Sequence, residues 1–528
     1  MASCLLAANK ASLLYCIRLL PTSLHAVALE AKHPEVASCN SLVLQGYGPP
    51  SAATCAPERA LVLSAIRELT SLTHLSIDHY WLYEAEDNFE DILYVAFTSL
   101  PKLSSLSLCD GWTGSALHAL HRALPSMTCL QQLRIDGSRN TSAGSDCFAS
   151  VHDINTLAIG LGHSVPTLQA LALHSCKPDC SQIDEICASL ACLTALTSLC
   201  LFGCFRDHRA ESASTCGHVA GPVAQLLRQL PLLQDLDLGS CLPRTGQLLG
   251  PVFDAIADLT DLKRLSHSSL PCPLGDNLPT DSDTHSNGRG PFAGTLMSRL
   301  APMLFRLSGL LHLDLSNVDL SVLHMAVSVE DSITVSLTQL TALILDGVHV
   351  FHSSFWPALA LNMSALVSLR QLSMAGVCMS GTDVHRQTFS RLAASVATCE
   401  CMDSWNLRSC RLDPVSADIL AGHLVAMTAL SHLDLSDNRL LLREGESIVR
   451  SLSCMPQIRR LVFGSEVPEC GRAAVRLGLE ECHGPEWEKI VHCHFPEIRG
   501  QSAARSDLIN RGFVERAYRR MFGEARVS

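Results

Sequence analysis

The chain has 528 residues, of which 47% are hydrophobic, 17% charged and only 5% aromatic. Its 39 basic and 51 acidic side chains give a net charge of 39 − 51 = −12 at pH 7. This composition excludes a disordered chain, which has few apolar residues and many charges. It also argues against a nucleic-acid-binding protein, because phosphate neutralisation requires a basic surface.

The N-terminal region contains only a short apolar run. Residues 12–17 lie between Lys10 and Arg18, whereas a membrane span needs roughly 18–20 apolar residues. The run is also too short for the core of a signal peptide. We therefore expect residues 1–37 to form a helical cap. Because Glu30 is the first acidic residue, a cleaved organelle transit peptide is the alternative.

A pattern of apolar-x-x-apolar-x-apolar recurs about fourteen times, as at Leu72, Leu75 and Ile77. Successive copies are separated by 31 residues from Leu75 to Leu106 and by 28 residues from Leu171 to Leu199. The central residues of the copies are Leu42, Leu75, Leu106, Leu133, Leu171, Leu199, Leu236, Leu265, Leu313, Leu343, Leu372, Trp405, Leu433 and Leu461. A repeat of this length predicts one supersecondary unit that is stacked many times.

A second column of residues lies three positions after the last apolar residue of each motif. It consists of Cys176, Cys204, Cys241, Val318, Val348, Val377, Cys410 and Asn438. A cysteine in such a column acts as a small buried apolar group. We therefore interpret the 24 cysteines as reduced thiols and expect an intracellular, cytoplasmic protein. Between the motifs, stretches such as 219–230 and 417–427 have apolar residues at three- and four-residue spacing, which predicts helices.

Residues 413–440 carry the fullest copy, with Leu430, Leu433, Leu435 and Asn438. On these residues the chain resembles the ribonuclease-inhibitor-like class of leucine-rich repeat proteins, over roughly residues 38–465. The resemblance implies an α/β solenoid, a horseshoe with a parallel β-sheet on its concave face and helices on its convex face. It implies a protein-binding role, and the remaining residues 466–528 are expected to form a C-terminal cap with amphipathic basic helices.

Strand residues alternate between two faces, so the residues between the leucines should point to the concave surface. Acidic residues outnumber basic ones there, which favours a basic protein partner; the alternative is an ordinary solvated face. The candidate binding residues on this face are His74, Asp78, Arg134, Asp136, Phe202, Asp235, Asp237, His312, Asp314, Asp346, Asn406, Arg408, His432 and Asp434.

A second candidate surface lies at the edge where the strands end. Trp81, Trp112 and Arg139 each follow the central leucine by six residues, and Tyr80 adjoins them. Exposed Trp, Tyr and Arg dominate the energetics of many interfaces, although Trp81 could instead pack under the next helix. The long spacings between motifs place insertions at 137–146, 205–217 and 270–292, which should project from this edge.

The sequence contains no P-loop, no His-Glu-x-x-His motif and no Gly-x-Ser-x-Gly motif. We therefore expect no catalytic residue, no cofactor and no metal site. The open alternative is metal binding by Cys482 with His492–His494, whose spacing fits no familiar zinc module.

We expect a monomeric, non-enzymatic interaction module without a membrane span, either a scaffold or an inhibitor. Two alternatives remain open. One is a GTPase-activating-like regulator of a small GTPase, because regulators acting on Ran use a similar repeat class. The other is the substrate receptor of a ubiquitin ligase or a relative of immune-type sensors.

Overall fold

The computed structural model describes residues 14–18, 40–45, 66–67, 69–78, 89–109, 114–136, 151–174, 183–204, 213–239, 250–267, 293–318, 332–348, 355–379, 382–438, 448, 451, 455 and 457–463. The chain divides into two compact units, Met1–Leu262 and Lys263–Ser528.

The first unit holds parallel strands that neighbour one another in chain order. They are β1 (Leu14–Arg18), β2 (Ser41–Gln45), β3 (His74–Asp78), β4 (Ser105–Cys109), β5 (Gln132–Asp136), β6 (Ala170–His174), β7 (Ser198–Cys200) and β8 (Asp235–Asp237). Its helices are α5 (Phe89–Thr98), α6 (Gly114–Ala123), η3 (Leu124–Ser126), α7 (Val151–Ser164), α8 (Ile183–Leu190), α9 (Ala213–Arg228) and α10 (Gly250–Ala257).

The second unit repeats the same parallel arrangement. Its strands are β9 (Arg264–Ser266), β10 (His312–Asp314), β11 (Ala342–Ile344), β12 (Gln371–Ser373), β13 (Ser404–Asn406), β14 (His432–Leu435) and β15 (Arg460–Phe463). Its helices are α11 (Ala293–Arg306), the π-helical turn η6 (Ser332–Ser336), α13 (Phe355–Asn362), η7 (Met363–Ala365), α14 (Asp383–Ala397) and α15 (Pro414–Leu424).

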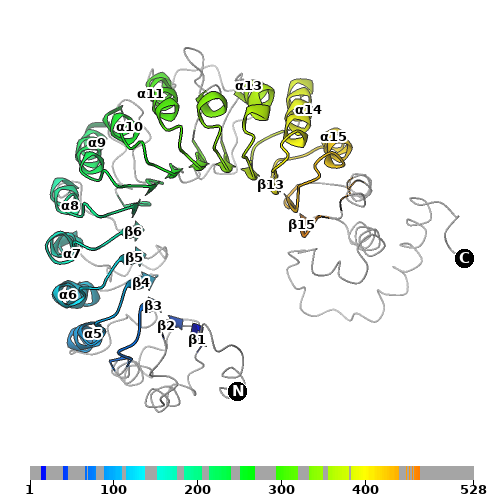
Figure 1. Cartoon of the computed structure of the whole chain (residues 1–528). Coiled ribbons are helices and arrows are strands. Elements are labelled where there is room, and N and C mark those ends of the chain that lie inside the picture. The colour runs from blue at the N-terminus through cyan, green and yellow to red at the C-terminus, as the bar shows by residue number, and fades with distance from the viewer. Residues whose placement is uncertain are drawn as a thin grey trace, which may run out of the picture. The chain divides into compact units, whose positions relative to one another are not determined.

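Within each unit the helices lie along one face of the strands (Figure 1). The fold is an α/β leucine-rich repeat solenoid, in which every repeat contributes a strand and most contribute a helix. Each repeat has too little apolar surface to be stable alone, so its leucines are buried against the repeats on either side.

Within each unit the central motif residues form a continuous row in the core. In the second unit Leu313 pairs with Leu343, which pairs with Leu372, and the row continues to Trp405. All four side chains are fully buried. Trp405 replaces leucine in this row, and its ring stacks on Phe389 with 6.3 Å between ring centroids. The fourteen predicted strands are therefore present, including the copy centred on a tryptophan.

After the strands, one repeat position takes a left-handed backbone, five residues after the first strand residue. It is occupied by Gly203, Asn317, Gly347, Gly376, Ser409 and Asp437, with φ between 55° and 75°. Its amide donates to the next repeat, as Gly376 N–H does to the carbonyl of Arg408 at 2.7 Å. The turn thus reverses the chain while it extends the parallel hydrogen bonding beyond the strand. Glycine occupies three of these six positions because a Cβ disfavours this conformation, and Asn317 and Asp437 belong to the few other residue types that adopt it readily.

In the column predicted after the strands, the described cysteine and asparagine side chains donate hydrogen bonds to the preceding repeat. The thiol of Cys204 donates to the carbonyl of Leu173 at 3.0 Å, and the thiol of Cys410 donates to the carbonyl of Met374 at 3.0 Å. Asn438 Nδ2 donates to the carbonyl of Leu407 at 2.7 Å. Cysteine and asparagine are thus donors to the same backbone position one repeat earlier, which explains why they share a column.

Two expectations from the sequence are wrong. Leu14–Arg18 form strand β1, which pairs in parallel with β2, and not part of a helical cap. This segment contains Tyr15 and Ile17, aromatic and β-branched residues that suit strands. Residues 213–217 were assigned to an insertion but begin helix α9. The other expected caps and insertions, including 466–528, lie outside the described residues.

The left-handed turn predicts opposite effects for two glycine-to-alanine substitutions. Gly376→Ala should destabilise the protein by about 1–2 kcal/mol, because alanine is strained at its φ of 75° even though the added Cβ would meet no atom closer than 3.7 Å. Gly422→Ala is the matched control on helix α15, where an added Cβ meets nothing within 4 Å. It should stabilise the protein by roughly 0.5–1 kcal/mol. Urea unfolding of both variants checks this, and equal signs would contradict the assignment of the turn.

A second prediction concerns Asp413, which caps helix α15. One carboxylate oxygen accepts the Ser416 N–H at 2.8 Å, and the other accepts Arg386 Nε and Nη2 at 2.9 and 2.8 Å. Burial raises the pKa of Asp413, but the bonds from Ser416 and Arg386 outweigh it and leave the pKa lowered. The charged carboxylate therefore contributes stability above its unfolded pKa of about 3.9, and this contribution is lost as the pH falls through the lower folded pKa.

Asp413→Asn keeps an acceptor for the Ser416 N–H but removes the charge. We expect it to be less stable than wild type by about 1 kcal/mol at pH 7 and to match wild type near pH 2. Urea unfolding across this pH range checks the prediction. A stability difference that stayed constant down to pH 2 would show that the charge is not what Asp413 contributes.

Candidate protein-binding face

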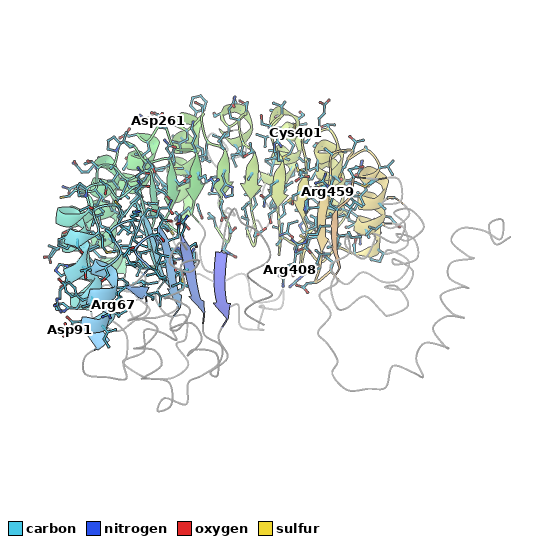
Figure 2. The ribbon with its side chains drawn as sticks, turned by 60° about the horizontal axis from the view of Figure 1, so that its bottom comes forward. Arg67, Asp91, Asp261, Cys401, Arg408 and Arg459 are labelled. Carbon is cyan, nitrogen blue, oxygen red and sulfur yellow. The ribbon has the colours of Figure 1, made fainter. Side chains whose placement is uncertain are left out.

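The side chains at the first, third and fifth positions of the strands lie on the face of the sheet opposite to the buried leucines. We call this the polar face, defined in each unit by the first and third residues of each strand and the fifth where the chain continues in line. Strands β4 and β6 alternate half-buried and buried residues along their length. Figure 2 shows Cys401 at the edge where strands begin and Arg408 at the edge where they end.

On the first unit, a chain of polar side-chain contacts crosses the polar face from β5 to β8. Arg134 donates to Asp136 through Nε and Nη2, at 3.1 and 2.9 Å from Oδ2. Asp136 Oδ1 lies 3.3 Å from Nδ1 of His174. His174 Nε2 lies 3.2 Å from the sulfur of Cys200, whose thiol is 3.3 Å from Oδ2 of Asp237. The order of groups along this chain is therefore guanidinium, carboxylate, imidazole, thiol and carboxylate.

Many polar-face acids also close a turn within their own repeat. Asp237 Oδ1 accepts the Gly239 N–H, Asp314 Oδ1 accepts the Ser316 N–H, and Asp434 Oδ1 accepts the Ser436 N–H, at 2.8, 2.8 and 2.9 Å. Each bond joins a side chain to the amide two residues later, which is the geometry of an Asx turn. These carboxylates are held in fixed positions, and part of the reason for acid on this face is structural.

Asp346 on the second unit is held from the neighbouring strand. Its Oδ1 accepts the hydroxyl of Ser373 at 2.5 Å and the N–H of Ala375 at 2.7 Å. Asn406 in turn donates to the Ser373 hydroxyl at 2.8 Å. Burial raises the pKa of Asp346 and the charge of Asp314 adds to this, which together outweigh the two hydrogen bonds. The face therefore keeps a carboxylate whose ionised form is unfavourable in the folded protein.

The C-terminal strands carry a second group of charges. Arg408 Nε donates to Asp437 at 2.7 Å, and both side chains are largely exposed. His432 Nδ1 lies 3.8 Å from a carboxylate oxygen of Asp403, and Ser431 bonds to both residues. Exposed pairs of this kind stabilise a fold little, so their side chains can exchange partners at small cost.

The predicted residues occupy two surfaces, one in each unit. His74, Arg134, Asp136, Phe202, Asp235 and Asp237 lie on or beside the polar face of the first unit, and Asp78 ends strand β3 there. His312, Asp314, Asp346, Asn406, Arg408, His432 and Asp434 do so in the second unit. Whether they bind a partner stays a prediction. The edge residues Tyr80, Trp81, Trp112 and Arg139 lie outside the described residues.

The structure adds His174, Cys200 and Ser373 to the residues that organise this face. Strand alternation places all three on it, but their role depends on bonds across strands. Cys200 and His174 pair diagonally, two positions out of register. No spacing within the sequence indicates a diagonal contact, so the sequence alone could not identify the pair.

Neither a metal centre nor a membrane-spanning helix is found among the residues that the structure describes. No three His, Cys, Asp or Glu side chains there form a group that could hold a metal ion. No helix in these segments is long and apolar enough to cross a membrane. The metal alternative at Cys482 and His492–His494 falls outside them.

Comparison with known proteins gives distant structural likenesses. No protein-family model and no curated protein matches the chain. The chain is similar to an internalin, inlF, from Listeria monocytogenes, at 15% identity and a TM-score of 0.38 over 81% of this chain and 88% of that one. It is also similar to TLR13 in a complex with ssRNA13, at 14% identity and a TM-score of 0.35 over 82% of this chain and 58% of that one. Similarity at this level says nothing about a shared ligand.

The raised pKa of Asp346 predicts a pH dependence opposite in sign to that of Asp413. An acid whose folded pKa is raised favours folding below its unfolded pKa and loses that contribution as the pH rises through the folded value. Asp346→Asn keeps the Oδ1 acceptor and removes the unfavourable charge. We expect the variant to be more stable than wild type at pH 7 by roughly 1 kcal/mol and equal to it near pH 3. Urea unfolding at both pH values measures this, and a variant less stable than wild type at pH 7 would contradict it.

Proposed function

We propose that this chain is a non-enzymatic protein-interaction module that binds a protein partner through the polar face and the edge where the strands end. We further propose that it belongs to the ribonuclease-inhibitor-like subclass of leucine-rich repeats. Repeat spacings near 28 residues and a helix of eight or more residues in most repeats support the subclass.

The observation that carries the proposal is the order of the charged side chains on the polar face. Asp237, Asp314 and Asp434 are each fixed by a backbone amide, and Asp346 is fixed by Ser373 and Ala375. Side chains that are already ordered lose little conformational entropy on binding, which increases affinity. A stacked sheet presents them at a spacing of about 4.8 Å between strands, which suits an extended protein surface.

We propose a basic partner. The polar face carries Asp237 in the first unit and Asp314, Asp346 and Asp434 in the second. The unfavourable ionisation of Asp346 would be relieved by a cation placed beside it. Lysine or arginine on a partner would supply that cation and would also speed the encounter. Phe202, half-buried beside His174 with ring centroids 6.0 Å apart, offers an apolar contact within the same face.

We propose a reducing, intracellular and cytoplasmic setting, and a monomer. The support for the reducing setting comes from the cysteines. None of the cysteine side chains that the structure describes takes part in a disulfide, and Cys204 and Cys410 act as hydrogen-bond donors within the core. Burial raises the pKa of Cys410 to about 12, so this thiol stays protonated and keeps its donor role.

The test is affinity purification with mass spectrometry, using variants that remove charge without breaking the turns. Asp235→Asn/Asp237→Asn alters the first unit and Asp314→Asn/Asp434→Asn alters the second, because asparagine still accepts the turn amide. Each removes two charges. We expect at least one of them to retain less than about a tenth of a partner that wild type recovers, since each lost charge pair at an interface costs roughly 1 kcal/mol or more.

The matched control is Asp184→Asn/Asp418→Asn, which removes two charges from exposed positions on helices α8 and α15. It should recover the partner at the wild-type level. All variants must unfold at urea concentrations close to that of wild type. Identical recovery by both polar-face variants and the control would contradict the assigned surface. If the partner is a GTPase that is recovered only in its GTP-bound form, and if this chain accelerates its GTP hydrolysis, the result would instead favour a GTPase regulator.

A further inference from the structure

Cys200 lies at the end of a relay of side chains on the polar face of the first unit. Its sulfur is 3.2 Å from Nε2 of His174, and Nδ1 of the same ring is 3.3 Å from Oδ1 of Asp136. A thiol, a base within hydrogen-bond reach and a carboxylate that orients the base make up the arrangement that activates a nucleophilic cysteine. The carboxylate is itself fixed by Arg134 at 2.9 Å.

The relay is accessible to small molecules. The side chain of His174 is 23% exposed and that of Asp136 is 16% exposed, and Cys200 is half-buried. Cys204, four residues further on, differs in this respect, because it is buried and donates to the carbonyl of Leu173. The solvent exposure of Cys200 is thus intermediate between that of a core thiol, which no reagent reaches, and that of an exposed thiol.

Asp237 counteracts the activation of Cys200 by His174. Its Oδ2 is 3.3 Å from the sulfur of Cys200, so it accepts a hydrogen bond from the thiol and repels a thiolate. Burial raises the pKa of Cys200, the charge of Asp237 raises it further, and the pKa reaches about 12 even with the N–H of Phe202 and Arg134 acting in the opposite direction. Asp237 itself is fixed by the Gly239 amide at 2.8 Å and cannot turn away without breaking that bond.

We propose that Cys200 is a modification site for disulfides that carry a cationic group, with His174 as its base, Asp136 as the residue that orients His174, and Asp237 as the contact for the cation. A cation beside Asp237 cancels the charge that holds the thiol protonated. The reagent that carries the cation therefore activates the thiol that attacks it. A neutral or anionic disulfide lacks this effect.

The step is a thiol–disulfide exchange. When the cation of the reagent occupies Asp237, the S–H of Cys200 turns from Asp237 to His174. His174 Nε2 then takes the proton, and the thiolate attacks one sulfur of the disulfide. A new S–S bond forms to Cys200 while the original S–S bond breaks. The leaving thiolate takes the proton from His174 and departs as a thiol, so that Cys200 is oxidised to a mixed disulfide and the other half of the reagent is reduced.

The same residues do not favour a metal ion in this arrangement. His174 and Asp237 lie on the strands either side of Cys200, β6 and β8. Within the described residues no three such ligands form a group that could hold a metal ion. A row of groups suits the passage of a proton along it, whereas a metal site needs ligands that converge on one point.

The experiment compares two small disulfides, the dication cystamine and the neutral bis(2-hydroxyethyl) disulfide. Initial rates of adduct formation at pH 7 are measured by mass spectrometry on the peptides that contain Cys200 and Cys129. Cys129 is exposed and serves as the reference thiol in the same protein. We expect the preference of Cys200 for cystamine to exceed that of Cys129 by about tenfold, the effect of one pKa unit on the thiolate fraction.

Variants separate the roles of the two neighbours. Asp237→Asn keeps the acceptor for Gly239, and it should raise the rate with the neutral disulfide about tenfold and reduce the preference to that of Cys129. His174→Gln retains a hydrogen-bonding side chain without a base, and it should lower both rates of Cys200 at least about tenfold. Neither should change the rates of Cys129.

Two results would overturn the proposal. One is an equal preference for cystamine at Cys200 and Cys129 in wild type. The other is an unchanged Cys200 rate in His174→Gln. If that variant unfolds, Asp136→Asn replaces it, because asparagine leaves the ring in place but no longer stabilises its protonated form; an unchanged rate there also overturns the proposal.

Discussion

The constraint on which this structure depends is that no repeat can bury its leucines by itself. The row from Leu313 through Leu343 and Leu372 to Trp405 is buried only because each strand lies in register with the next. To stay in register, the strands must be followed by turns of the same geometry. The left-handed turn and the column of residues after it provide this common geometry, and the hydrogen bonds of the turn join one repeat to its neighbour.

The same ending also determines the chemistry of the polar face. An aspartate near the end of a strand accepts the turn amide with one oxygen, as Asp434 does from Ser436, and its other oxygen remains on the face. One residue type, aspartate, can therefore serve both the turn and a binding surface. Asp346 differs from the other aspartates, because its ionised form is disfavoured by burial and by Asp314. Such a residue is where a functional contribution is easiest to separate from a structural one.

The sequence predicts the periodic features well and the contacts between repeats poorly. Leucine spacing located fourteen strands, and strand alternation placed residues such as Asp314 and Arg408 on the polar face, because both depend on local geometry with a period of two. Strand β1 lacks the full motif, so its pairing with β2 was missed. The relay from Asp136 through His174 to Cys200 was also missed. Asp136 and His174 are paired in register, but the step from His174 to Cys200 is diagonal, and its distance follows from packing and strand twist.

The most direct test of this account is amide hydrogen exchange on Asn438→Ala. Asn438 donates to the carbonyls of Leu407 and Leu435 and accepts the N–H of Leu412, so its side chain links two successive turns. If turns hold the repeats in register, exchange should accelerate at residues 404–412 and 432–438 and stay unchanged around Leu313 in strand β10. Unchanged exchange at both turns, or an equal acceleration throughout the second unit, would contradict the claim that these turns join each repeat to its neighbour.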